Sequence, residues 1–213
     1  TLPEGREIQQ RLIAGADVVI ANLPDAARVK LGLDYDTLKA IKPDIIVTSA
    51  TAFGTTGPYA TKVGFDLVAQ AMSGAMYLSG NEGQPMRSYF PWVDYGTATL
   101  AALGTMAAIM HHKATGEGQQ VEGSLLATAL TNGNATLIEQ ALVQKNRVAT
   151  GNCGQLSAPA DAYDTTDGQI IVLALGPGMH RRWAKLMGEE HWLTDPRFAD
   201  DESRAEHGEI ISA

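Results

Sequence analysis

Cysteine is nearly absent from this 213-residue chain, in which Cys153 stands alone. A single cysteine excludes an internal disulfide framework and is typical of a reducing compartment, so we expect a cytoplasmic protein. Long apolar runs are also missing: no stretch reaches the roughly 20 residues that a membrane helix needs. The chain opens on TLPEGREI, without Met and without the basic start and apolar core of a signal peptide. We expect further protein upstream.

Basic residues are in the minority, with 16 Lys and Arg against 24 Asp and Glu and a formal net charge of −8. Because binding to a nucleic-acid backbone needs a basic stripe, this balance argues against nucleic acid as the partner. An anionic cofactor stays compatible, since local cations and helix N-termini can bind it. The five histidines are scattered, and the adjacent His111 and His112 would lie on different faces of a helix. We therefore expect no metal site.

Hydrophobic residues make up 45% of the chain, which is enough for a substantial core. The apolar spacing predicts an amphipathic helix over residues 3–13 and buried strands over 17–21 and 44–49. Helical segments at 25–31 and 35–41 separate the two strands. Strand, helix and strand without hairpin turns favour parallel strands in a doubly wound α/β sheet. An antiparallel α+β unit is the alternative.

The remaining pattern predicts an Ala-rich core helix at 95–112, and the sequence pattern changes near residue 150. The other expected elements are helices at 64–76, 125–143 and 179–187 and strands at 120–123 and 169–174. We predict a large Rossmann-like domain over residues 1–130, a linker over 131–150 and part of a smaller α+β domain over 151–213.

Seven short motifs follow one another along the chain: DVVIAN at 17–22, LGLD at 31–34, FGTTGPY at 53–59, FDLVAQAMSG at 65–74, VD at 93–94, KATGEGQ at 113–119 and DPRF at 195–198. Each is weak alone, but their succession resembles the family III CoA-transferases, whose relatives include the α-methylacyl-CoA racemases. The resemblance implies a Rossmann-like large domain, a smaller domain and an interlocked homodimer. This chain would be about half of such a protein.

Asp94 lies between the apolar Trp92-Val93 pair and a long apolar helix. We expect the helix N-terminus to keep this carboxylate ionised and nucleophilic. The resemblance implies that Asp94 attacks an acyl-CoA and then carries CoA as an aspartyl thioester. The alternative is that Asp94 only caps its helix.

The pair Phe65-Asp66 bears on the type of reaction. In the racemases that the chain resembles, the position of Phe65 is a histidine that acts with the aspartate as a second base. A phenyl ring accepts no proton, so Phe65 argues against a racemase. The resemblance implies that Asp66 supports the reactive aspartate, and the alternative is a simple helix N-terminal acid.

Contacts with CoA are implied by the same resemblance for Asn22, Leu23, Lys30, Phe53 and Gly54. Asn22 follows the first buried strand, and ligands bind at the carboxyl ends of parallel strands. Many family members have an arginine where Pro24 stands here, so one phosphate contact is missing or supplied elsewhere. Lys30 could equally be an ordinary exposed lysine.

The segment 151–155 resembles a glycine-rich loop that covers the reactive aspartate in some transferases. On this basis Gly154 and Gln155 are candidate catalytic residues, because backbone N–H groups can bind an oxyanion. The alternative is an ordinary domain linker. Cys153 lacks the histidine context of a nucleophile, and we interpret it as a bystander.

Taken together, the sequence predicts an acyl-CoA:carboxylate CoA-transferase with CoA as substrate and acyl carrier, acting as a homodimer on acyl-CoA and carboxylic acids. The alternatives are a racemase-like isomerase and a catalytically silent CoA-binding fragment. The sequence does not name the acids. A dicarboxylate would need a second cation, for which Arg87 is the nearest candidate in the sequence.

Overall fold

The computed structural model describes residues 2–212 and separates them into two compact units. The first comprises the residues up to Met76 together with Arg87–Arg147. The second comprises Tyr77–Met86 together with the residues from Val148 onward. The change of unit after Arg147 falls inside the predicted linker, which is helical as far as Val143.

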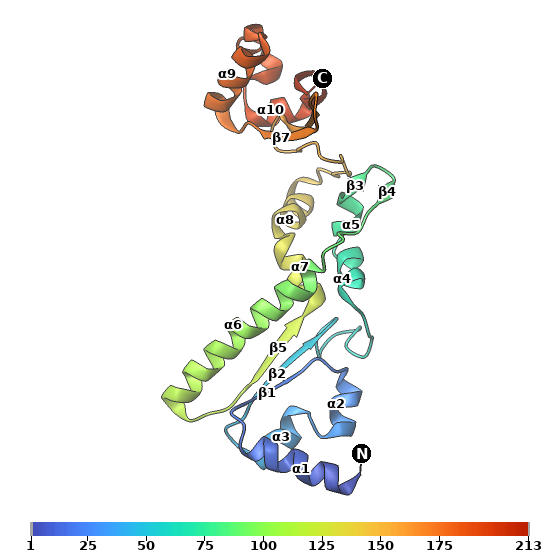
Figure 1. Cartoon of the computed structure of the whole chain (residues 1–213), viewed down its shortest axis with the longest axis vertical. Coiled ribbons are helices and arrows are strands. Elements are labelled where there is room, and N and C mark those ends of the chain that lie inside the picture. The colour runs from blue at the N-terminus through green and yellow to red at the C-terminus, as the bar shows by residue number, and fades with distance from the viewer. Residues whose placement is uncertain (1, 213) are drawn as a thin grey trace. The chain divides into compact units, whose positions relative to one another are not determined.

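A parallel three-stranded sheet is the centre of the first unit (Figure 1). Its strands are β1 (Val18–Ala21), β2 (Ile46–Thr51) and β5 (Gln120–Ser124), in the order β1-β2-β5. Both pairings are parallel, with Val19 opposite Val47 and Thr48 opposite Val121. The predicted α/β class is therefore confirmed, and the antiparallel alternative is excluded.

Three helices accompany these strands in the first unit. The helix α1 (Pro3–Ala14) precedes β1, and α2 (Asp25–Leu31) and α3 (Tyr35–Ile41) connect β1 to β2. Their core consists of Ile13, Leu38, Ile45 and Val47, each at most 5% exposed. The side chain of Asp34 caps α3 by accepting a hydrogen bond from the N–H of Thr37 at 3.0 Å. This core joins α1 and α3 to the beginning of β2.

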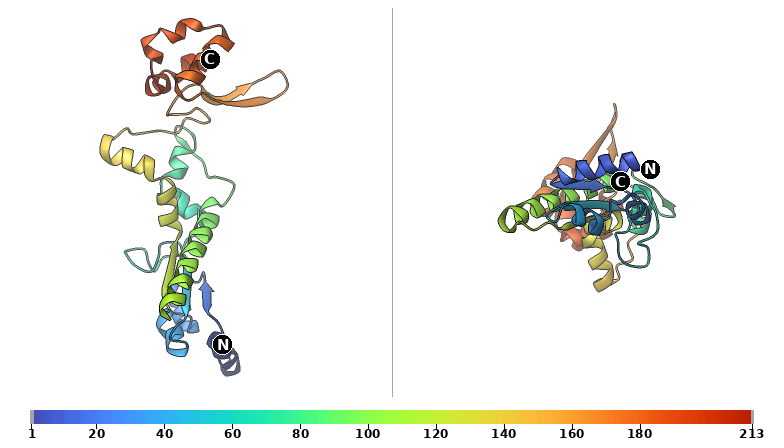
Figure 2. Two further views of the ribbon diagram at one scale, coloured as in Figure 1. Left: turned by 90° about the vertical axis from the view of Figure 1, so that its left-hand side faces the viewer. Right: turned by 90° about the horizontal axis from the view of Figure 1, so that it is seen from below.

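The long helix α6 (Trp92–Thr115) packs against β2 and β5, and its course along the strands is visible in Figure 2. Its buried residues are small and recur every three or four positions: Val93, Thr97, Ala101, Thr105 and Ala108. Small side chains let the helix approach β5 closely, where a Cβ on Gly123 would lie 3.1 Å from Thr97. The predicted core helix is thus buried along one face, and its opposite face is exposed.

Among the glycines of this unit, Gly118 leaves the least room for a side chain. A Cβ added there would lie 2.2 Å from the carbonyl oxygen of Ile45. We predict that Gly118→Ala lowers the free energy of unfolding by about 2 kcal/mol, because backbone atoms have to move. The control is Gly5→Ala in α1, where nothing lies within 4 Å. Equal stability of the two variants in urea unfolding would contradict this packing.

Two helices of the first unit pack against α6: α4 (Asp66–Met72) and α7 (Leu125–Asn132). The helix α8 (Asn134–Val143) follows α7 and packs against it. Ala69, Val93 and Ala129 form a buried cluster that joins α4, α6 and α7. The N-terminal turn of α6, which carries Asp94, is therefore held from two sides.

The second unit combines helices with short antiparallel strands. Its hairpins are β3 (Gly80–Asn81) with β4 (Gln84–Pro85) and β6 (Ala160–Asp164) with β7 (Gln169–Leu173), the latter seen in Figure 2. The helix α5 (Ala75–Leu78) leads into β3, and the C-terminal helices are α9 (Gly176–Met187), η1 (Glu190–Leu193), η2 (Pro196–Phe198), α10 (Asp201–Glu206) and α11 (Gly208–Ile211). Their core contains Ala184, Trp192 and Phe198.

The DPRF motif has a structural role in this unit. The carboxylate of Asp195 accepts a hydrogen bond from the N–H of Arg197 at 2.9 Å and caps η2. The Arg197 guanidinium pairs with the same carboxylate at 2.6 Å, and these bonds lower the pKa of Asp195 to about 2. Within residues 2–212, no helix combines the length and the apolarity needed to cross a bilayer.

Candidate active site

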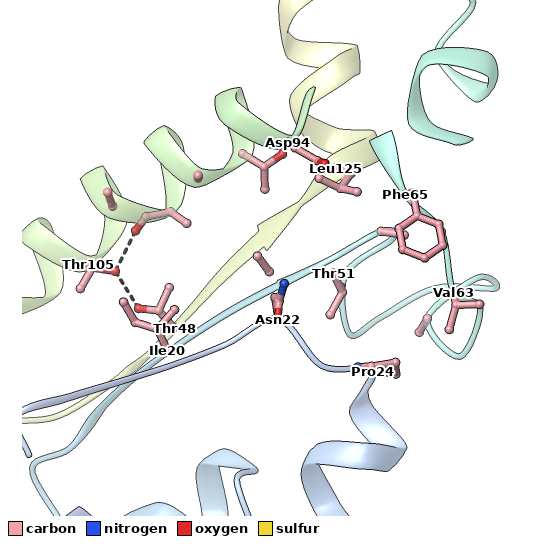
Figure 3. Close-up of a pocket in the computed structure, with 18 of the residues that line it drawn as sticks. Ile20, Asn22, Pro24, Thr48, Thr51, Val63, Phe65, Asp94, Thr105 and Leu125 are labelled. Carbon is pink, nitrogen blue, oxygen red and sulfur yellow. Dashed lines mark hydrogen bonds between the residues drawn. The ribbon is translucent and has the colours of Figure 1, made fainter. Parts of the chain in front are cut away.

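A cavity of about 910 Å³ opens in the first unit between α6 and the carboxyl ends of β1 and β2 (Figure 3). This volume is in the range of small-molecule sites, and the place is where open α/β sheets bind ligands. Most of the lining side chains are small or apolar. They are Ile20, Asn22, Pro24, Thr48, Ala50, Thr51, Ala52, Ala60, Lys62, Val63, Gly64, Phe65, Asp94, Thr97, Ala98, Ala101, Ala102, Thr105, Met106 and Leu125.

Asp94 is the only acidic residue among those lining residues, and Lys62 is the only basic one. Figure 3 shows Asp94 on α6, across the cavity from the ends of the strands. Partial burial raises the pKa of the Asp94 carboxyl, and the nearby charge of Asp66 raises it further. These two effects oppose the one expected from the helix N-terminus, and the ionised, nucleophilic state of Asp94 stays a prediction.

The N-terminus of α6 is capped by Asp66 from α4, not by Asp94. One carboxylate oxygen of Asp66 accepts hydrogen bonds from the N–H groups of Val93 at 2.8 Å and Asp94 at 3.1 Å. Asp66 is only 8% exposed. The alternative that Asp94 merely caps its helix is thus excluded, since the capping groups are occupied by another side chain.

The other oxygen of Asp66 accepts a hydrogen bond from the side-chain amide of Gln70, one turn later on α4. The amide oxygen of Gln70 accepts a hydrogen bond from the N–H of Ser88 at 2.9 Å. A buried chain of hydrogen bonds therefore leads from Ser88 through Gln70 and Asp66 to the backbone of Asp94. The four-residue spacing of Asp66 and Gln70 in FDLVAQ predicts that they share one helix face. It does not predict the contact of Gln70 with Ser88.

The five predicted CoA-contacting residues occupy different places. Asn22 lines the cavity at the end of β1, and Leu23 beside it is half-buried. Lys30 is exposed on α2 and is not a lining residue. Phe53 and Gly54 lie in the loop after β2, next to the lining residues Thr51 and Ala52. The structure thus brings Asn22 and Asp94 to one cavity and leaves Lys30 away from its wall.

The loop after β2 is held in place by Glu122 of β5. Its carboxylate accepts hydrogen bonds from the backbone N–H of Thr55 and from the Thr55 hydroxyl, the latter at 2.8 Å. A Cβ on Gly54, whose φ is +84°, would lie 2.6 Å from the same carboxylate. Gly54 is needed here because the backbone is left-handed and close to Glu122.

Lys62 is a site residue that the sequence analysis missed. It follows Tyr59 in the loop, and its ammonium lies 4.9 Å from the centroid of the Tyr59 ring. The Tyr59 ring in turn lies 5.4 Å from the Phe53 ring. Arg87, the cation expected from the sequence, is exposed and is not among the lining residues.

Phe65 lines the cavity at the N-terminus of α4, and the residue is 78% exposed. Figure 3 shows the ring across the cavity from Asn22 and close to Thr51. An apolar ring at this place offers no lone pair to a proton, which fits the argument against a two-base mechanism.

The loop with Gly154 and Gln155 belongs to the second unit. The N–H of Gly154 donates to the carbonyl of Ala160 at 2.6 Å, and a Cβ there would lie 2.5 Å from the Ala160 Cβ. The Gln155 amide donates to the carbonyl of Val148 at 2.6 Å. These bonds order the loop within its own unit and occupy the Gly154 donor that an oxyanion would need.

In the described part of the chain, no group of three or more His, Cys, Asp or Glu side chains is placed so that it could hold a metal ion. Cys153 has a raised pKa because of burial and the nearby Asp161, which disfavours a reactive thiolate.

The parallel sheet and the cavity beside Asp94 define an α/β protein with a candidate small-molecule site, and the sequence comparisons define its family. The family model described as CoA-transferase family III matches residues 1–213. The chain belongs to this family, as its motifs indicated.

Curated relatives include the succinate–glutarate CoA-transferase of Agrobacterium fabrum, 34% identical over 96% of this chain and 52% of that protein. The succinyl-CoA–D-citramalate CoA-transferase of Chloroflexus aurantiacus is 33% identical over 96% of this chain and 52% of its own length. Among solved structures, a CaiB/BaiF family protein from Brucella suis is 30% identical, with a TM-score of 0.81 over 99% of this chain and 57% of that one. The chain thus spans about half the length of the relatives that it matches.

Proposed function

We propose that the protein containing this chain transfers CoA between carboxylic acids, with Asp94 as the covalent carrier. The observation that carries the proposal is the place of Asp94: it is the one acid in the wall of a cavity at the ligand-binding edge of the sheet, and a buried side chain caps its helix. A carboxylate is suited to this reaction because it can form both an anhydride and a thioester.

The reaction proceeds in two half-reactions, in which Asp94 is first loaded with CoA and then passes it to the acceptor. The ionised Asp94 attacks the carbonyl of the donor acyl-CoA, the carbon–sulfur bond breaks, and a mixed anhydride and the CoA thiolate result. The thiolate attacks the aspartyl carbonyl and releases the donor acid, which leaves an aspartyl-CoA thioester. The acceptor carboxylate then reverses these steps and leaves as its CoA ester.

Asp66 contributes to this reaction through its charge as well as its hydrogen bonds. Its negative charge opposes the ionised form of Asp94 and so raises the pKa of that carboxyl. The covalent forms of Asp94 carry no charge, so the repulsion disappears when the anhydride or the thioester forms. Asp66 therefore favours the loaded states over the free carboxylate.

Succinyl-CoA and short dicarboxylic acids are the substrates that we propose. The relatives named above are described as acting on succinate and glutarate and on succinyl-CoA and D-citramalate. The direct test is to express the complete open reading frame and to measure CoA transfer from succinyl-CoA to a panel of mono- and dicarboxylic acids. Transfer to none of them would overturn the proposal, and exchange of the α-proton of an acyl-CoA would favour an isomerase. Three further properties remain predictions from the sequence: homodimerisation, the interlocked arrangement of the two subunits and the cytoplasmic location.

Lys62 is the residue that we expect to bind the CoA phosphates, because it is the cation of the cavity wall. Lys62→Ala should raise the KM for succinyl-CoA about tenfold, which corresponds to the loss of one charge-assisted hydrogen bond, with little change in kcat. The matched control is Lys30→Ala, because Lys30 is exposed on α2 and outside the lining. A larger KM effect at Lys30 than at Lys62 would contradict this placement.

A further inference from the structure

The side chain of Gln70 is among the most deeply buried polar groups of the first unit, with 2% exposure. It lies on α4 between Ser88 and Asp66, and it does not line the cavity. A buried amide needs partners for both its N–H and its oxygen, since each unpaired group would cost free energy. Gln70 has both, and one of them is the carboxylate that caps the helix of the proposed nucleophile.

The two partners of Gln70 allow only one orientation of its amide. The Ser88 N–H can only donate, so it must meet the amide oxygen, at 2.9 Å. The ionised Asp66 carboxylate can only accept, so it must meet the amide N–H. Gln70 thereby fixes one oxygen of Asp66 and leaves the other for the N–H groups of Val93 and Asp94.

We propose that Gln70 is a positioning residue for the reaction at Asp94, because its amide holds the Asp66 carboxylate in the orientation that caps α6. This inference rests on the proposed function. Without the amide donor, the buried Asp66 carboxylate keeps its two bonds to α6 but loses the bond that sets its rotation. The Asp94 carboxylate, carried on the first turn of that helix, then loses its defined position.

Replacement by glutamate gives a test that depends on pH. Glutamate has nearly the shape of glutamine, and its neutral form can donate to Asp66 and accept from Ser88. Its ionised form can only accept, and it repels Asp66. Gln70→Glu should therefore retain transfer within about threefold of the parent at acid pH and fall about 30-fold or more below it at alkaline pH. Each rate is compared with the parent at the same pH.

Two further variants separate positioning from a general loss of structure. Gln70→Met has no titratable group, so its deficit, about 10- to 100-fold in kcat, should be the same at every pH. In α8, Gln140 makes the same pair of bonds, with its amide N–H to Asn146 Oδ1 and its oxygen accepting from the Asn146 N–H. Gln140→Glu should leave transfer unchanged at every pH.

The measurement is the pH profile of kcat and of the KM for succinyl-CoA in the complete protein and these variants. We expect a deficit of Gln70→Glu that grows with pH, reverses when the pH is lowered and resides in kcat. A deficit of Gln70→Glu that is independent of pH, or a fully active Gln70→Met, overturns the inference while the proposed function stands. If Gln70→Met does not fold, the reversible response of Gln70→Glu still decides. A parent without transfer activity overturns the proposed function itself.

Discussion

Replacing Asp94 by alanine should reduce CoA transfer on the order of 10⁴-fold or more, the loss typical of removing a covalent nucleophile. The folded protein should not be destabilised. The pKa of Asp94 is raised by burial and by Asp66, so its ionised form is disfavoured in the folded state, and this penalty applies at pH values above its pKa in the unfolded chain. Loss of activity at neutral pH should therefore come with unchanged or increased stability. Steady-state rates and urea unfolding measure the two quantities.

The matched control for this variant is Asp36→Ala. Asp36 is also an acid in the first turn of a helix of the same unit, but it lies on α3 and does not line the cavity. It should keep the full transfer rate. An Asp94→Ala variant that retains more than about a tenth of the parent rate would show that Asp94 is not the carrier.

Asp66→Asn should slow transfer roughly 100-fold and should shift its acid limb to lower pH. Transfer in the parent rises with pH through the raised pKa of Asp94, because only the ionised carboxylate attacks. Removing the Asp66 charge lowers that pKa, so Asp94 ionises at lower pH. It also removes the repulsion that is relieved when Asp94 forms the anhydride or the thioester, so these loaded states are less favoured. The pH dependence of kcat/KM measures both effects.

The choice of asparagine separates charge from capping. Its side-chain oxygen can still accept hydrogen bonds from Val93 and Asp94, although its NH2 group then faces the Gln70 amide N–H and that bond is lost. Asp66→Ala loses the capping bonds as well and should cost about 1–3 kcal/mol of stability. An acid limb at the same pH in the parent and in Asp66→Asn would contradict the proposed electrostatic role.

The order of helices and strands in the first unit followed from the sequence, because local patterns determine it. The apolar runs at 17–21 and 44–49 and the helices between them appear as predicted, and their parallel pairing follows from the crossover connections. The buried face of α6 could also have been read from its spacing of small residues. These features depend on residues close together in the sequence.

Features that depend on distant contacts were not predictable in the same way. The segment 77–86 groups with the second unit because Gly80 accepts a hydrogen bond from Gly151 and Asn81 bridges Thr150, some 70 residues later. The strand β6 was also missed, although its pairing with β7 is local and the two are joined by a short turn.

At the site, motif comparison singled out Asp94 and Asp66, but it did not predict the two effects that raise the pKa of Asp94. A helix N-terminus is visible in a sequence, whereas burial and a facing carboxylate from another helix are not. Lys62 and Gln70 were missed because a loop places one in the cavity wall and a buried hydrogen bond to Ser88 gives the other its role.

The central claim is that Asp94 carries CoA covalently, and mass spectrometry tests it most directly. The complete protein is mixed with succinyl-CoA without acceptor, quenched in acid, and analysed intact and after proteolysis. A CoA adduct on the peptide that contains Asp94, absent from Asp94→Ala and present in Asp36→Ala, is the predicted result. An adduct on another residue, or transfer at full rate with no adduct at any time after mixing, would contradict the account.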